Sequence, residues 1–155
     1  MTSIESRLRE LGLVLPDAPA PVANYVPACL VGDLLFISGQ VSRKADGGMI
    51  TGKLGGGLDV AQGREAARVC ALNVLAQAKS ALGSLDRIAR IVKLTGFVNA
   101  VPAFTDHPQV VNGASDLLVE VLGDRGRHTR SAVGMSSLPV DAAVEVEAIL
   151  AVTPA

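Results

Sequence analysis

Hydrophobic residues recur along the chain at helical spacing in three segments. Ile4, Leu8 and Leu11 predict a short helix over the first dozen residues. Longer stripes predict helices over residues 59–83 and 108–122. A glycine closes each of these two segments, as is common where helices end. The first of them also opens with an Asp-x-x-Gln pattern, which resembles a capping box.

Short apolar runs bounded by turn residues predict the strands. The first two runs flank the dipeptide Gly32-Asp33, a two-residue turn typical of a hairpin. The glycine-rich segment 43–57 is predicted as a loop. The predicted strands cover residues 28–31, 34–38, 88–98, 131–135 and 143–152.

The order of these elements predicts an α+β fold. Strand pairs alternate with single helices, which favours a mixed sheet with two long helices on one face. The other face of that sheet is then left uncovered. No internal repeat or second domain is evident, so residues 1–155 are expected to form one domain with an N-terminal helical extension over about 1–20.

Composition and charge exclude several classes of protein. Hydrophobic residues make up 49% of the 155 residues and charged residues 19%, which excludes a disordered chain. No apolar run reaches the roughly 18 residues of a membrane span, and no secretory signal is evident, so a cytoplasmic protein is expected. The net charge of −1 does not favour nucleic-acid binding. No metal site is expected, and Cys29 and Cys70 lie in apolar runs typical of buried thiols.

In the segment 130–147, Arg130 shares one strand face with small residues that include Ala132, and Glu145 and Glu147 share one face of the next strand. If these two strands paired as a hairpin around 138–139, Arg130, Glu145 and Glu147 would project together onto the uncovered face. A guanidinium is a two-pronged receptor for a carboxylate, and a nearby glutamate can position or deprotonate a water molecule. The same spacing also fits a solvated face with a surface salt bridge, and both interpretations remain open.

Four stretches of the chain form an ordered pattern over roughly residues 21–152. They are PVANYVPACLVGDLLFISGQV, the helical segment Ala71-Leu72-Asn73-Val74, IVKLTGFVNAVPAF and RSAVGMSSLPVDAAVEVEAILAV. Together these stretches resemble the RidA family (the YjgF/L-PSP group). Ala132 stands where many members carry Cys, and the first twenty residues are additional, which indicates a longer, divergent subgroup.

The resemblance implies a chorismate-mutase-like fold and a homotrimer in which three sheets form a barrel with clefts between subunits. It also implies hydrolysis of reactive 2-imino and enamine acids to 2-keto acids and ammonia, without a cofactor. By the same resemblance, Arg130 would hold the substrate carboxylate and Glu145 would lie near the attacking water. The residues implied to line the substrate site are Tyr25, Ser38, Gly39, Asn112 and Ala132.

Two other functions remain open at this stage. The cleft could serve a non-catalytic protein that binds small carboxylates, because its lining differs from that of common members. Endoribonuclease activity, a label attached to some relatives, is disfavoured by the net charge and by an aromatic content of only 3%.

Overall fold

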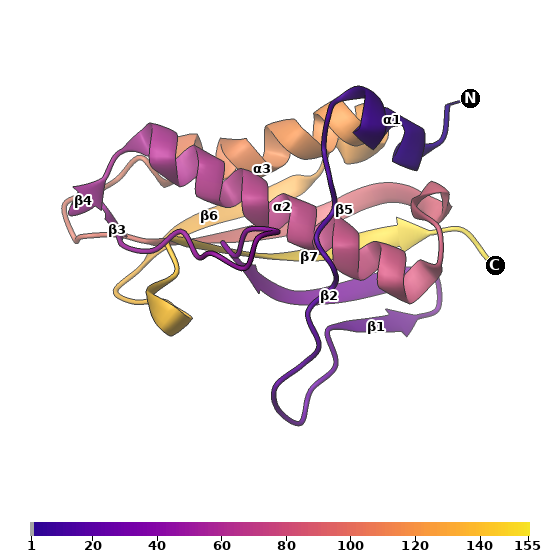
Figure 1. Cartoon of the computed structure of the whole chain (residues 1–155), viewed down its shortest axis with the longest axis horizontal. Coiled ribbons are helices and arrows are strands. Elements are labelled where there is room, and N and C mark those ends of the chain that lie inside the picture. The colour runs from indigo at the N-terminus through magenta and orange to yellow at the C-terminus, as the bar shows by residue number, and fades with distance from the viewer. Residues whose placement is uncertain (1) are drawn as a thin grey trace.

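A five-stranded mixed sheet forms one layer of the structure, and helices form the other (Figure 1). The computed structural model describes residues 2–155. The strand order is β1-β2-β7-β5-β6, in which only β5 and β6 run parallel to each other. The strands of this sheet are β1 (Ala28–Val31), β2 (Leu34–Val41), β5 (Ile88–Asn99), β6 (Thr129–Met135) and β7 (Val144–Val152), and the separate short pair is β3 (Lys53–Leu54) with β4 (Gly57–Leu58).

The three predicted helices are confirmed, with ends close to those predicted. They are α1 (Ile4–Glu10), α2 (Val60–Leu82) and α3 (His107–Leu122). Asp59 and Gln62 form the capping box of α2, and Gly83 ends that helix with φ of 79°, a conformation that glycine adopts without strain. Short 3-10 turns cover Leu85–Arg87, Gly123–Gly126 and Pro139–Asp141.

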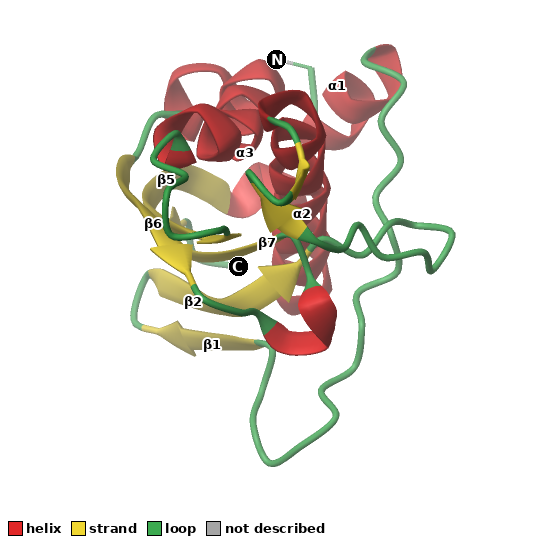
Figure 2. Cartoon of the chain, turned by 90° about the vertical axis from the view of Figure 1, so that its left-hand side faces the viewer, coloured by secondary structure: helices red, strands yellow, loops and turns green. Residues whose placement is uncertain are grey.

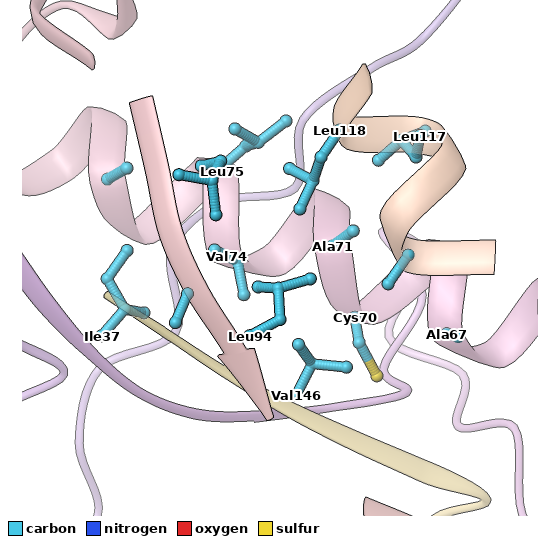
Figure 3. Packing of buried hydrophobic residues seen from close by; sticks show 14 of the residues in the cluster. Ile37, Ala67, Cys70, Ala71, Val74, Leu75, Leu94, Leu117, Leu118 and Val146 are labelled. Carbon is cyan, nitrogen blue, oxygen red and sulfur yellow. The ribbon is translucent and has the colours of Figure 1, made fainter. Parts of the chain in front are cut away.

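The core lies between the two long helices and the inner face of the sheet. α2 contributes several small residues, among them Ala67 and Ala71, which let the helix approach the strands closely. Figure 3 shows α2 residues such as Val74 beside Leu94 of β5 and Val146 of β7. Burial of each large aliphatic side chain stabilises the fold by about 1.5–3 kcal/mol. Among residues 2–155, no α-helix covers the other face of the sheet (Figure 2).

The helix α1 packs onto the same core rather than standing apart from it. Ile4 and Leu8 are buried, and the backbone N–H of Ile4 donates to Asp86 Oδ1 over 2.8 Å. In return, Glu5 accepts a hydrogen bond from the Leu85 N–H. The loop between α1 and β1 then projects past the β1 edge of the sheet (Figure 1).

The predicted hairpin between the last two strands is wrong. β6 pairs in parallel with β5, and β5 lies between β6 and β7. The reason is α3, which carries the chain from the end of β5 back to its beginning, so that β6 must run in the same direction as β5. The turn at Pro139–Asp141 then leads across β5 to β7.

The prediction of two buried thiols holds only for one cysteine. Cys70 on α2 is fully buried, its Sγ donates to the Val144 carbonyl, and burial raises its pKa well above the ordinary value. Cys29 is exposed, because it lies on β1 opposite Phe36, on the face of the sheet that no helix covers.

Replacing Gly113 on α3 by alanine is expected to lower the melting temperature, although alanine favours helices. A Cβ at this position would lie 2.0 Å from the Arg64 carbonyl oxygen of α2, so the two helices must move apart. Thermal denaturation of Gly113→Ala should show a loss of several degrees. Gln109→Ala, at an exposed position of the same helix, should melt like the wild type. Equal melting temperatures for all three proteins would contradict this close helix packing.

Candidate active site

Arg130 of β6 points toward α3, where two neutral side chains hold it. Its Nη1 donates to Asn112 Oδ1 at 2.8 Å and to Ser115 Oγ at 3.2 Å. Asn112 and Ser115 are three residues apart, which places them on one face of the helix. Among residues 2–155, no carboxylate pairs with Arg130, and its Nε and Nη2 donors have no acceptor. This free edge of the guanidinium fits a carboxylate in a two-pronged arrangement.

His128 forms a hydrogen bond with the Ser115 hydroxyl. Its Nδ1 lies 2.6 Å from the Gly126 carbonyl oxygen, and its Nε2 lies 2.9 Å from Ser115 Oγ. A carbonyl only accepts, so Nδ1 carries the proton and Nε2 accepts from the hydroxyl. Burial lowers the pKa of His128, and the positive charge of Arg130 lowers it further against the opposing effect of the Gly126 hydrogen bond. The neutral imidazole therefore leaves the oxygen of Ser115 free to accept from Arg130.

Ala132 follows Arg130 on the same face of β6. It is partly buried and packs against the core under α3. Its small side chain adds no polar group to the site.

Glu145 lies on β7, directly over Gly39 of β2. A Cβ at position 39 would lie 2.1 Å from Glu145 Oε1, so the carboxyl group can occupy this place only beside a glycine. Partial burial raises the pKa of Glu145, and the neighbouring Glu147 raises it further. A carboxyl with a raised pKa exchanges a proton nearer to neutral pH than an ordinary glutamate, which suits a general base.

Ser38 and Gly39 occupy a β-bulge. The pairing of β2 with β7 passes from Ile37 to Gln40 and leaves these two residues out of register. Ser38 Oγ donates to the Val26 carbonyl oxygen at 2.9 Å, which fixes the loop that carries the half-exposed Tyr25. Ser38 also lines a cavity of about 290 Å³ on the open face of the sheet.

The predicted site residues therefore form two groups on opposite faces of one chain. Arg130 is in register with the buried Leu94 and faces α3, whereas Glu145 is in register with Phe97 and faces the open side. The prediction that Arg130 shares the open face with Glu145 and Glu147 is wrong for Arg130. The inserted strand β5 separates β6 from β7, and the inner face of β6 is the one that meets the helix. One chain does not bring the two groups together.

Ser115 and His128 belong to the site but were not predicted from the sequence. The spacing of Asn112 and Ser115 on a predicted helix was a usable signal, because both must lie on one helical face. The contact between Ser115 and His128 had no such signal, because it joins α3 to the segment after a 3-10 turn.

Residues 2–155 contain no group of three or more His, Cys, Asp and Glu side chains placed to hold a metal ion. In the same part of the chain, every helix is too short or too polar to cross a membrane.

Comparison with known proteins identifies the family. The family model described as "YjgF/chorismate mutase-like, putative endoribonuclease" matches residues 5–150. The chain therefore belongs to the YjgF family, the group also called RidA or L-PSP, and has the corresponding mixed α+β fold.

Three relatives illustrate the range of similarity. The Trypanosoma cruzi protein TCP17 is 49% identical, over 95% of this chain and 92% of its own length. The crystal structure of Agrobacterium tumefaciens Atu1372, a protein of unknown function, is 50% identical with a TM-score of 0.90, over 97% of this chain and 92% of that one. The 2-iminobutanoate/2-iminopropanoate deaminase of Dermatophagoides farinae is 28% identical, over 88% of this chain and 92% of its own.

Replacing Glu145 by glutamine is expected to stabilise the protein at neutral pH. The pKa of Glu145 is higher in the folded state than in the unfolded state, so the folded protein ionises this carboxyl less readily. The folded state therefore loses stability relative to the unfolded state as the pH rises from the ordinary glutamate pKa through the folded-state pKa. Glutamine removes this charge, so a higher melting temperature than that of the wild type is expected at pH 7. The difference from wild type should shrink as the pH falls and should vanish well below the ordinary glutamate pKa, where Glu145 is protonated in both states.

The matched control for this measurement is Glu65→Gln, an exposed glutamate on α2, which should leave the melting temperature unchanged. A Glu145→Gln variant that melts below the wild type at pH 7 would show that the carboxylate stabilises the fold, contrary to the expectation.

Proposed function

We propose that the protein, acting as one RidA-like domain over residues 1–155, hydrolyses reactive 2-imino and enamine acids to 2-keto acids and ammonia. The free edge of the Arg130 guanidinium carries this proposal. A half-buried cation held only by neutral groups is suited to an anionic ligand, since an internal carboxylate would have neutralised it. The deaminase among the relatives supports imino acids as the class of ligand.

The proposed site lies between subunits of a homotrimer. Arg130, Asn112 and Ala132 of one subunit would meet Tyr25, Ser38, Gly39 and Glu145 of the next. The opposite orientation of these groups in one chain supports this arrangement, because groups on opposite faces can meet only across an interface. Apolar side chains on the open face support association, since Val31, Phe36 and Val133 are exposed in the single chain.

The chemistry follows from the charges of the two groups. Nε and Nη2 of Arg130 bind the carboxylate of the protonated imine and orient its C=N carbon toward Glu145 of the neighbouring subunit. A water molecule attacks this carbon as Glu145 accepts one of its protons, and the C=N electron pair moves to nitrogen. The product is a neutral carbinolamine.

Collapse of the carbinolamine completes the reaction. Glu145 returns its proton to the nitrogen, the C–N bond breaks and ammonia leaves as the carbonyl forms. The hydroxyl proton passes to Glu145 and from there to the departing ammonia, so that ammonium leaves and the Glu145 carboxylate is restored. The imine is already activated toward water, so the residues need only bind, orient and move protons.

A coupled assay tests the activity. An amino-acid oxidase generates imines from a panel of amino acids, and semicarbazide traps what remains. The wild type should reduce trapping, and Arg130→Ala should lower kcat/KM about a hundredfold through the loss of charged hydrogen bonds. Arg127→Ala, which removes an exposed arginine three residues away, should behave like the wild type.

Unchanged trapping by the wild type across the panel would contradict the deaminase proposal. Calorimetric binding of a 2-keto acid without turnover, lost in Arg130→Ala, would then identify a carboxylate-binding protein.

The assembly has its own test. Phe36→Asp places a charge in the apolar open face and should convert the trimer to monomers, with loss of deaminase activity. Val22→Asp, at a 95% exposed position outside the sheet, should change neither. Light scattering coupled to size exclusion measures the mass, which should be three times the 15.9 kDa of the chain for wild type and Val22→Asp. A wild-type mass equal to one chain would contradict the shared site.

A further inference from the structure

A cavity of about 650 Å³ opens where β5 and β6 end, beside the first turn of α3. Its walls are largely apolar and come from Val101, Pro102, Phe104 and Met135. This volume lies within the range of roughly 300–1,000 Å³ that is usual for small-molecule sites. No acidic residue lines it, and its two ionisable lining side chains are Lys53 and His107.

Lys53 is held at the cavity wall by two neutral oxygens. Its Nζ donates to Asn99 Oδ1 at 2.7 Å and to the Ser136 carbonyl oxygen. Among residues 2–155, no carboxylate forms an ion pair with this ammonium group. An ammonium has three N–H donors, so one remains for a ligand. An exposed surface lysine would not be fixed in this way.

The support for Lys53 extends into the core. Asn99 is fully buried, and its Nδ2 donates to Asp141 Oδ1 and to the Ala142 carbonyl oxygen, which turns its Oδ1 toward Lys53. Val140 and Asp141 have φ of 52° and 55°, a left-handed conformation that is costly for residues other than glycine. Backbone strain of this kind concentrates at functional sites.

His107 forms another part of the cavity lining. Gly134 of β6 makes room for the imidazole, because a Cβ there would lie 2.4 Å from His107 Nε2. The Phe104 ring stands perpendicular to the imidazole at a centroid distance of 5.4 Å. The cavity thus combines one fixed cation, one imidazole and an aromatic surface.

We propose that this cavity binds a small organic carboxylate with an apolar or aromatic body. The carboxylate accepts the remaining N–H of Lys53, and the body packs against Phe104, Val101 and Met135. The Lys53 cation favours a negatively charged ligand, and the apolar walls favour a ligand whose remaining part is apolar. This binding depends neither on Arg130 nor on the proposed deamination.

Calorimetry with 3-phenylpropanoate and its neutral analogue 3-phenylpropan-1-ol tests the proposal on the whole chain. The wild type should bind the acid and should bind the alcohol at least tenfold more weakly. Lys53→Met should weaken binding of the acid about tenfold or more, through loss of a charged hydrogen bond. Lys79→Met, which replaces an exposed lysine on α2, should bind the acid within twofold of wild type.

A conservative variant covers the case in which Lys53→Met fails to fold because Asn99 loses its partner. Lys53→Arg keeps the cation and should bind the acid within about fivefold of wild type. Three results would overturn the proposal. They are no binding of the acid by the wild type, equal affinity for acid and alcohol, and unchanged affinity for the acid in Lys53→Met, which would assign the acid to another site such as that of Arg130.

Discussion

The parallel pairing of β5 and β6 is the constraint on which the arrangement of the candidate site depends. It follows from the α3 crossover, which returns the chain along one face of the sheet before β6 begins. The crossover puts β6 at the edge of the sheet and turns its inner face toward α3. Arg130 thereby meets Asn112, and Glu145 is left on the far face, two strands away.

This separation places the two groups of the proposed site on opposite faces of one chain. One group offers a cation with unused donors and the other offers a carboxyl whose pKa is raised by burial and by Glu147. The cation and the carboxyl would form an ion pair if they lay side by side in one chain, and neither would then be available to a substrate. In the proposed trimer, an interface between subunits would let a substrate lie between them.

Arg130 and Lys53 are held in a similar way in different parts of the molecule. Each receives two neutral oxygen acceptors, from Asn112 and Ser115 in one case and from Asn99 and Ser136 in the other. Neutral acceptors fix the direction of a charged donor without cancelling its charge. In both places a buried or half-buried asparagine amide supplies one of the oxygens, and its position depends on contacts remote in sequence.

The sequence by itself determined the elements of this protein and the types of residue at its site. The capping box of α2, the glycine after it and the turn at Gly32 act over two to four residues, so each can be read without the fold. The alternation along β6 also placed Arg130 and Ala132 correctly on one face. Tertiary structure alone decided which face that was, which strand lay beside β6, and that His128 would meet Ser115. These features depend on the position of β5 between β6 and β7 and on contacts between segments distant in sequence. Local sequence patterns predict neither of these.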